Sequence, residues 1–329
     1  MLFEIKKTIF IYGIILICIL ISVFSIFGRF ETDSLKQEMK KTVESKELIS
    51  YFDDIYYYKV ESLAKKMVYV AKNLVFDNAD YNSQSILPVG EVYSKDGEIV
   101  NYSAGRSIYN PKKYELTFES DVIISTKNLI VTSNKAKYHT EEEIMTNWGN
   151  VKSDVTDEKN GDKIIVFSDE VVSRPYKKTS KFSGDVHGYI KRKKIYEERI
   201  NFKSQQLLLD LNAYTAELIT DVYLQKGGLE ARAKRGEIYL DNYNKNLKYY
   251  VLYDDVKMLE KLTLKNGTSF VRTGFAEKVE GIVSEDKVIL SGNPKVFQVE
   301  DVIKGNRITL RENSEVIEID DAITNFILK

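Results

Sequence analysis

The chain has 329 residues, and its 48 basic and 49 acidic side chains leave a formal net charge of −1. This balance excludes the strong basic field that would favour nucleic acid as a partner. A single cysteine, Cys18, excludes an intrachain disulfide and a cysteine zinc site, and the 2 histidines leave little room for metal chemistry or histidine-based catalysis. We therefore expect no metal and no cofactor.

The first element is an apolar run at residues 8–27, which contains no charged side chain. As a helix, a run of this length crosses about 30 Å of hydrocarbon. A cleaved signal peptide would have a shorter apolar core and a small-x-small cleavage site, and neither is evident. We therefore predict a transmembrane helix that anchors the chain in a membrane.

A polar stalk or linker is expected at residues 28–50, where Leu35, Met39 and Val43 form a short amphipathic stripe. Lysine and arginine side chains are more numerous shortly after the apolar run than before it. Counting them would place the body in the cytoplasm, but this rule is weak for long translocated domains. The charge count therefore leaves the side of the membrane open.

From residue 51 onward, apolar and polar residues alternate with a period of two, as in Leu116 and Phe118 on either side of Thr117. Three Asp-Gly or Asn-Gly dipeptides, at residues 96–97, 160–161 and 266–267, have the residue types that tight hairpin turns require. No convincing helical pattern follows residue 76. These features predict an all-β body.

A register mark recurs through this body. An Asp or Asn followed by Val, and once by Pro, occurs at Asp121, Asn150, Asp185, Asp221, Asp255 and Asn293. The steps between these positions are 29, 35, 36, 34 and 38 residues. Repetition at such a period predicts an elongated stack of two-strand units. We interpret the Asp and Asn residues as turn formers at strand starts, and not as a row of ligand sites.

A second pattern accompanies the mark: an apolar residue, a small residue two positions later, and an apolar or small residue after three more. It occurs at Val131/Ser133/Ala136, Val166/Ser168/Val171, Phe202/Ser204/Leu207, Ala231/Ala233/Gly236 and Ile303/Gly305/Ile308, with an earlier copy at Tyr102/Ala104/Ser107 and a degraded one at Arg272/Gly274/Glu277. Small inward residues leave room between facing sheets, so we expect a space for an elongated apolar ligand. The alternative is that Tyr and Phe side chains of the facing sheet fill this space.

The groove candidates are the inward residues of the alternating segments. They are Leu116, Phe118, Val131, Ser133, Ala136, Val166, Phe202, Leu229, Ala231, Ala233, Ile303, Gly305 and Ile308. Near the C-terminus, Ile323, Phe326 and Ile327 are candidates for an edge that adds a strand to another protein's sheet, although this apolar end could also fold back on the core. No dinucleotide-binding, P-loop, nucleophile-elbow or HExxH motif occurs, so we expect no enzyme.

Two segments carry a family resemblance. NLIVTSNKAKY at residues 128–138 and GGLEARAKRGEIYLD at residues 227–241 resemble repeats of LptC, the bitopic component of the lipopolysaccharide export bridge. The stretch at residues 288–321, with Gly-Asn-Pro at 292–294 and Gly-Asn-Arg-Ile at 305–308, resembles LptA/OstA repeats. The resemblance implies one N-terminal transmembrane helix followed by an elongated β-jellyroll, or β-taco, of stacked two-strand repeats. It implies an LptC-like part at residues 51–154 and an LptA/OstA-like continuation at residues 155–329.

The resemblance also implies a function. An LptC-like protein would be anchored in the inner membrane with its body in the periplasm, and would accept lipopolysaccharide from the LptB/LptF/LptG ABC transporter. The acyl chains would lie between the sheets, and an LptA-like or LptD-like jellyroll would join by strand addition. The alternative that the residues leave open is a membrane-anchored structural or adhesion β-repeat protein with a filled core. An envelope polysaccharide enzyme is the least supported reading, because no catalytic constellation is evident.

Overall fold

The computed structural model describes most of the chain after residue 48. The described residues are 49–61, 64–77, 81–93, 99–127, 129–156, 163–191, 199–240, 247–263, 267, 269–311, 314 and 317–320. The predicted transmembrane helix at 8–27, almost all of the predicted stalk, and Ile323, Phe326 and Ile327 lie outside them. Within these ranges no helix has both the length and the apolar character needed to cross a membrane.

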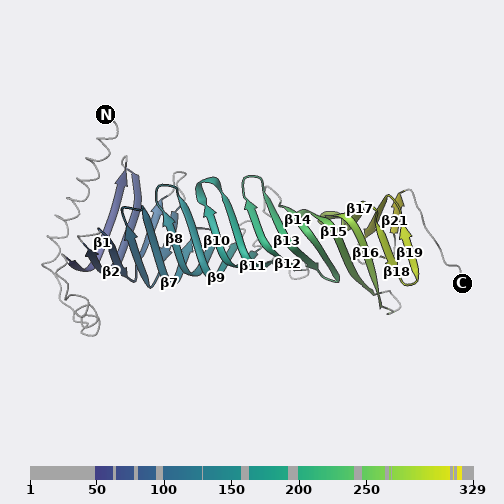
Figure 1. Ribbon diagram of the computed structural model, residues 1–329, viewed down its shortest axis with the longest axis horizontal. Coiled ribbons are helices and arrows are strands. Elements are labelled where there is room, and N and C mark those ends of the chain that lie inside the picture. Colours follow the sequence, from purple (N-terminus) through teal and green to yellow (C-terminus); the bar gives the residue numbers. More distant parts are fainter. Residues whose placement is uncertain are drawn as a thin grey trace, which may run out of the picture.

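The described residues form 21 strands that join into one sheet, and every pair of neighbouring strands is antiparallel. The strands stack along the length of an elongated body, from β1 at one end to β21 near the other (Figure 1). The strands are β1 (Ile49–Glu61), β2 (Ala64–Asp77), β3 (Ser83–Ile86), β4 (Val89–Tyr93), β5 (Ile99–Ser103), β6 (Arg106–Asn110), β7 (Glu115–Ser125), β8 (Leu129–His139), β9 (Ile144–Thr156), β10 (Lys163–Arg174), β11 (Thr179–Lys191), β12 (Ile200–Asp210), β13 (Thr215–Lys226), β14 (Leu229–Leu240), β15 (Leu247–Thr263), β16 (Ser269–Ile282), β17 (Lys287–Ser291), β18 (Lys295–Gln298), β19 (Asp301–Lys304), β20 (Arg307–Arg311) and β21 (Ile317–Asp320), with 3-10 turns η1 (Pro175–Lys177) and η2 (Val283–Glu285). The predicted all-β, elongated stack is confirmed.

From β7 to β16 each strand pairs with the next one along the chain, and most of these ladders are interrupted once near the middle. Between β7 and β8, for example, the register shifts between Glu119 and Val122. The strands bend there, so the sheet folds back on itself along a line of corners. The two facing sheets expected from the sequence are therefore the two halves of one folded sheet.

The halves that end in the turns at residues 111–114, 140–143, 175–178, 211–214 and 283–286 form layer A, and the opposite halves form layer B. The layers face each other: Lys226 Nζ at the rim of layer B lies 3.5 Å from Asp286 Oδ1 at the rim of layer A. The corners close one side of the fold, and the hairpin turns border the other. The strands that flank the predicted hairpins at 96–97, 160–161 and 266–267 pair antiparallel, as expected, whereas the dipeptides themselves, apart from Gly267, lie outside the described residues.

Near both ends of the body the corner is sharp enough to divide a strand. Residues 83–93 form β3 in layer A and β4 in layer B, and β2 pairs with both. Residues 287–298 likewise form β17 and β18, and both pair with β16. Gly292 and Asn293 stand between these two short strands with positive φ angles.

The recurring Asp/Asn mark forms the corners, and the expectation that it stands at strand starts is wrong. Its residues have φ angles in the left-handed region: Asp121 (51°), Asn150 (51°), Asp185 (39°), Asp221 (53°), Asp255 (53°) and Asn293 (53°). Asp and Asn adopt this conformation more readily than other residues with a Cβ. The apolar residue that follows fills the inside of the bend, and Val122, Val151, Val186, Val222, Val256 and Pro294 are all buried.

Replacing Asp221 with Val tests this role of the mark. A β-branched residue is disfavoured in the left-handed region, so Asp221→Val should be about 1–2 kcal/mol less stable to unfolding than Asp221→Gly. Urea unfolding of the full chain in detergent, followed by the β-sheet circular dichroism signal, measures the difference. Equal stability of the two variants would show that the corner does not depend on this backbone conformation.

The small residue of the second pattern also serves the corner. Ser133, Ser168 and Ser204 are buried, and each hydroxyl donates a hydrogen bond to the carbonyl two residues later, at 3.0, 3.0 and 2.8 Å. At the bulge, backbone groups lose their partners in the ladder. The serine hydroxyl gives the carbonyl two residues later a hydrogen-bond donor inside the protein. These small residues therefore stabilise the bend.

The copy of this pattern on β16 is displaced by two residues from the position expected from the sequence. Ala276 pairs with Val256 at the corner, as Ser204 does with Val186. The copy is therefore Gly274/Ala276/Val279, and Arg272/Gly274/Glu277 is wrong. The correction leaves Arg272 on an inward position near the rim of layer B.

Candidate functional site: the inward face of the folded sheet

Cross-strand pairing connects the inward residues into rows that run along the body. Inner row B, on layer B, consists of Tyr102, Ile124, Val131, Ser153, Val166, Gly188, Phe202, Leu224, Ala231, Met258, Gly274, Val296 and Ile303. Inner row A, on layer A, consists of Phe118, Ala136, Asn147, Val171, Phe182, Leu207, Leu218, Gly236, Leu252, Val279, Leu290 and Ile308. Every member of both rows is buried.

Two further rows lie closer to the open side. Mouth row A consists of Leu116, Tyr138, Met145, Ser173, Ser180, Leu209, Ala216, Ile238, Tyr250, Gly281, Val288 and Leu310. Mouth row B consists of Leu129, Val155, Ile164, Ile190, Ile200, Lys226, Leu229, Glu260, Arg272 and Gln298. A ligand between the layers would contact the inner rows, and one entering from the side would pass the mouth rows first.

The structure places the groove candidates in three settings. Inner row B contains Val131, Val166, Phe202, Ala231 and Ile303, and inner row A contains Phe118, Ala136 and Ile308. The mouth rows contain Leu116 and Leu229. Ser133, Ala233 and Gly305 lie at the corners. The first two groups share one continuous inward face, whereas the third group forms the bend at its back. That these residues contact a lipid stays a prediction.

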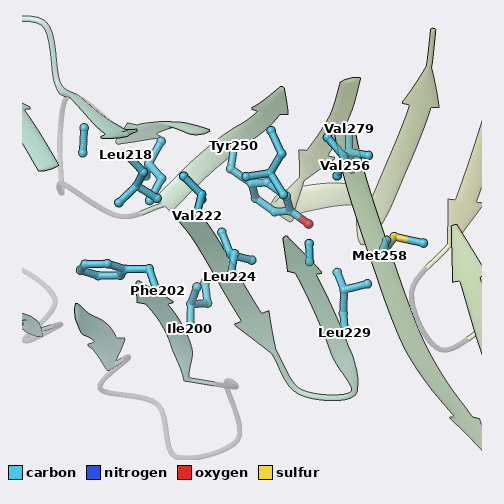
Figure 2. Close-up of a cluster of buried hydrophobic side chains, with 14 of the residues drawn as sticks. Ile200, Phe202, Leu218, Val222, Leu224, Leu229, Tyr250, Val256, Met258 and Val279 are labelled. Carbon is cyan, nitrogen blue, oxygen red and sulfur yellow. The ribbon is translucent and has the colours of Figure 1, made fainter. Parts of the chain in front are cut away.

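Side chains of the two layers pack against each other along most of the body. One buried apolar cluster extends from Val131 to Leu310, and a second surrounds Phe118 nearer the N-terminal end. In Figure 2, Leu218, Leu224, Phe202 and Tyr250 project into the space between strands of the two layers. A ligand between the layers must therefore displace or separate these side chains.

Three inward aromatic residues lie over a glycine of the neighbouring strand. Tyr102 pairs with Gly90, Phe202 with Gly188 and Tyr250 with Gly281. A Cβ atom at Gly281 would stand 2.0 Å from the Tyr250 ring, so only glycine leaves space for the ring to lie along the sheet. These three aromatic side chains therefore fill space along their own layer, over the neighbouring strand, as well as between the layers. The sequence pattern did not indicate this packing.

Between the two apolar clusters the inward face is polar. Asn147 in inner row A is buried and donates a hydrogen bond to Ser133 Oγ at 3.1 Å, and Ser153 in inner row B is buried beside Val131. The backbone ladder continues through this region and through the predicted boundary at residue 155, since Thr156 of β9 pairs with Lys163 of β10. The sheet is therefore continuous from end to end of the described body.

In the N-terminal cluster, two phenols lie on the inward face. Tyr69 Oη is 2.9 Å from Ser107 Oγ, which lies 2.7 Å from Ser85 Oγ, and Tyr102 Oη donates to the Val68 carbonyl at 3.1 Å. Burial raises the pKa of both Tyr69 and Tyr102 above the ordinary tyrosine value. Both groups are therefore uncharged at physiological pH, and this end of the inward face gains no charge from them.

The charged members of mouth row B were missed by the sequence reasoning. Lys226, Glu260 and Arg272 occupy inward positions in the same phase as Leu224, Met258 and Gly274. A charge in the apolar phase of an alternating strand was the signal that could have found them. Within the described ranges, no group of three or more His, Cys, Asp or Glu side chains could hold a metal ion.

Comparison with known proteins finds a family match for one segment of the chain. Residues 201–316, about a third of the chain, match the family model described as "LptA/(LptD N-terminal domain) LPS transport protein". Among solved structures, the chain is similar to LptH, the LptA homologous periplasmic component of the lipopolysaccharide transport device from Pseudomonas aeruginosa, with 17% identity, a TM-score of 0.34, and coverage of 37% of this chain and 82% of that chain. None of the curated proteins compared with the chain matches it. The segment that matches the model of the LptA and LptD N-terminal lipopolysaccharide-transport domain thus extends from β12 to the turn before β21.

Proposed function

We propose that the protein is a periplasmic bridge component that carries lipopolysaccharide with its acyl chains between the two layers. The match of residues 201–316 to a lipopolysaccharide-transport domain is the observation that carries the proposal. The inner rows support it, because they extend the buried inward face beyond that segment to Tyr102, with a polar interruption at Asn147 and Ser153. Burying acyl chains there would favour binding by about 0.8 kcal/mol for each CH₂ group kept from water.

The proposal includes the N-terminal part of the chain. The apolar run at residues 8–27 supports an anchor in the inner membrane, with residues 28–50 as the stalk. We assign residues 51–154 an LptC-like role, in which this end receives lipopolysaccharide from an LptB/LptF/LptG transporter, and residues 155–329 an LptA-like role. ATP hydrolysis would belong to the transporter.

The ends of the stack suit assembly with similar proteins. In the described residues β1 pairs with β2 alone, and β21 pairs with β20 alone, so each presents a free backbone edge. We propose that an LptA-like or LptD-like jellyroll adds a strand at one of these edges. Ile323, Phe326 and Ile327 follow β21 in the sequence and remain our candidates for the contact.

The second candidate is a membrane-anchored structural or adhesion protein with a permanently filled core. One observation favours it: most residues of the inner rows bury each other in two apolar clusters along the body. Under this reading the layers would never separate, and the apolar face would only stabilise the rod.

Depletion of the chain in its own organism separates the two functions. A bridge component should cause newly made lipopolysaccharide to accumulate in the inner-membrane fraction within a few generations, and the full chain expressed from a plasmid should restore export. Pulse labelling followed by membrane fractionation measures this. Normal arrival of labelled lipopolysaccharide at the outer membrane, with envelope defects alone, would support the structural role instead.

A further inference from the structure

The composition of mouth row B changes abruptly along the body. From β8 to β12 its residues are aliphatic: Leu129, Val155, Ile164, Ile190 and Ile200. From β13 to β18 they are Lys226, Leu229, Glu260, Arg272 and Gln298. The change falls at the pair Ile200–Lys226, between β12 and β13.

Burial of mouth row A changes at the same strands. Its members from Tyr138 on β8 to Leu209 on β12 are half-buried, whereas those from Ala216 on β13 to Leu310 on β20 are buried. Leu209 and Ala216 pair with each other across β12 and β13. Two independent properties, the charge of one rim and the solvent exposure of the other, therefore divide the open side at one boundary.

Arg272 shows how the second part is closed. Its side chain is 0% exposed and its Nη2 lies 2.5 Å from Glu260 Oε2. Its Nε donates to the same oxygen at 3.1 Å and its Nη1 to Gln298 Oε1 at 3.4 Å. These three bonds hold the guanidinium on the rim of layer B.

The remaining two bonds of Arg272 reach the opposite rim. Nη1 donates at 3.1 Å to the carbonyl of Ser314, between β20 and β21, and Nη2 donates at 3.4 Å to the carbonyl of Arg311, the last residue of β20 in layer A. All five guanidinium donors are thereby used. The side chain ties one rim to the backbone of the other, which a lysine with its single nitrogen could not do in the same way.

Lys226 makes a second connection across the open side. Its side chain is 12% exposed, and its Nζ lies 3.5 Å from Oδ1 of Asp286, the residue that directly follows η2. Asp286 is 71% exposed, so this contact forms the outer margin of the closed part. We call Lys226–Asp286 and Glu260–Arg272 with its carbonyl partners the rim clasp.

We propose that acyl chains enter the space between the layers sideways through the aliphatic mouth between β8 and β12, and that the rim clasp closes the mouth from β13 onward. This inference rests on the proposed function and assigns the strands through which acyl chains pass between the layers, which begin in the LptC-like part and continue beyond residue 154. On layer B an acyl chain passing Ile164 or Ile190 meets aliphatic side chains, and on layer A it passes the hydroxyls of Ser173 and Ser180, which lie 3.0 Å from each other. Passing Arg272 would require separating a buried ion pair without replacing its hydrogen bonds, which is strongly unfavourable. Chains past β12 therefore move lengthwise between the layers.

Thiol labelling of the full chain in detergent tests the closure. Cys18→Ser removes the sole cysteine, and Leu209→Cys and Val288→Cys then report on the two parts of mouth row A. Because a buried thiol reacts only during local opening, maleimide should label Leu209→Cys about tenfold faster than Val288→Cys. Arg272→Met should raise labelling of Val288→Cys by about tenfold and leave that of Leu209→Cys unchanged. Asp286→Asn, which alters an exposed residue and leaves the core intact, should give a smaller rise at Val288→Cys.

A photo-crosslinking amino acid at the same two positions tests the loading. With purified lipopolysaccharide, adducts should form early at position 209 and later at position 288, and Arg272→Met should remove the delay. Equal labelling rates at the two cysteines, no response to either clasp variant, or equal adduct rates would overturn the inference while leaving the proposed function intact. Absence of lipid adducts at every inward position would instead overturn the proposed function.

Discussion

Replacing Arg272 with Met should lower the free energy of unfolding by about 3–5 kcal/mol. Met retains most of the apolar volume of the side chain but removes both guanidinium bonds from the carboxylate of Glu260, which is 3% exposed. The carbonyls of Arg311 and Ser314 would lose a donor as well. Urea unfolding of the full chain in detergent measures the loss.

Two variants control this prediction. Arg232→Met makes the same change at an exposed position, where the guanidinium lies 5.8 Å from the Tyr223 ring, and should change stability by less than about 0.5 kcal/mol. The double variant Glu260→Gln/Arg272→Met should recover part of the loss, since it also removes the buried negative charge that Arg272 balances. If Arg272→Met were as stable as Arg232→Met, the clasp would have no energetic role.

Replacing Leu218 with Ala should lower the free energy of unfolding by about 2–5 kcal/mol. Leu218 is fully buried in inner row A, between Leu207 and Gly236, and packs in the cluster shared by both layers. Removing its three terminal carbons leaves a cavity that the neighbouring glycine cannot fill. Thermal and urea unfolding of the full chain measure the change.

Leu208→Ala is the matched control for this substitution. Leu208 stands on the neighbouring strand β12, faces outward and is half-buried, so the same truncation should cost about 1 kcal/mol or less. Similar losses for the two variants would contradict the assignment of Leu218 to a packed inter-layer face.

The architecture was largely predictable because it follows from repetition. A mark that recurs about every 35 residues allows the same two-strand unit to be stacked many times, and alternation identifies the residues that face inward. Val131, Phe202 and Ile303 were placed on one inward face for this reason, and they share inner row B.

The position of the mark within its strand was not predictable in the same way. Asp and Asn tolerate the left-handed region in a hairpin turn and at a mid-strand corner alike, so residue type does not distinguish the two. In Thr220–Asp221 two successive residues have positive φ angles, and this bends a strand without ending it. The serine two residues after the apolar position, as in Ser204, is the accompanying signal, because its hydroxyl serves the carbonyl of Gln206 at the bulge.

The rim clasp escaped sequence reasoning for a different reason. Glu260 and Arg272 are separated by a hairpin turn and meet only because β15 and β16 pair in one register, and the bonds of Arg272 to Arg311 and Ser314 exist only in the folded sheet. Both are charged residues at inward positions that the alternation of the strand otherwise gives to apolar residues, so in the sequence they resemble interruptions of that alternation. They are instead the polar contacts that hold its open side together.

Photo-crosslinking in cells tests the central claim, that lipopolysaccharide travels between the layers, most directly. A photo-reactive amino acid would be placed at the inward positions Val131, Leu229 and Ile303, and at Glu230 and Arg232 on the outward phase of β14. Lipopolysaccharide adducts should form at all three inward positions and at neither control. Absence of adducts at every inward position in exporting cells, or equal adducts at Arg232, would contradict it.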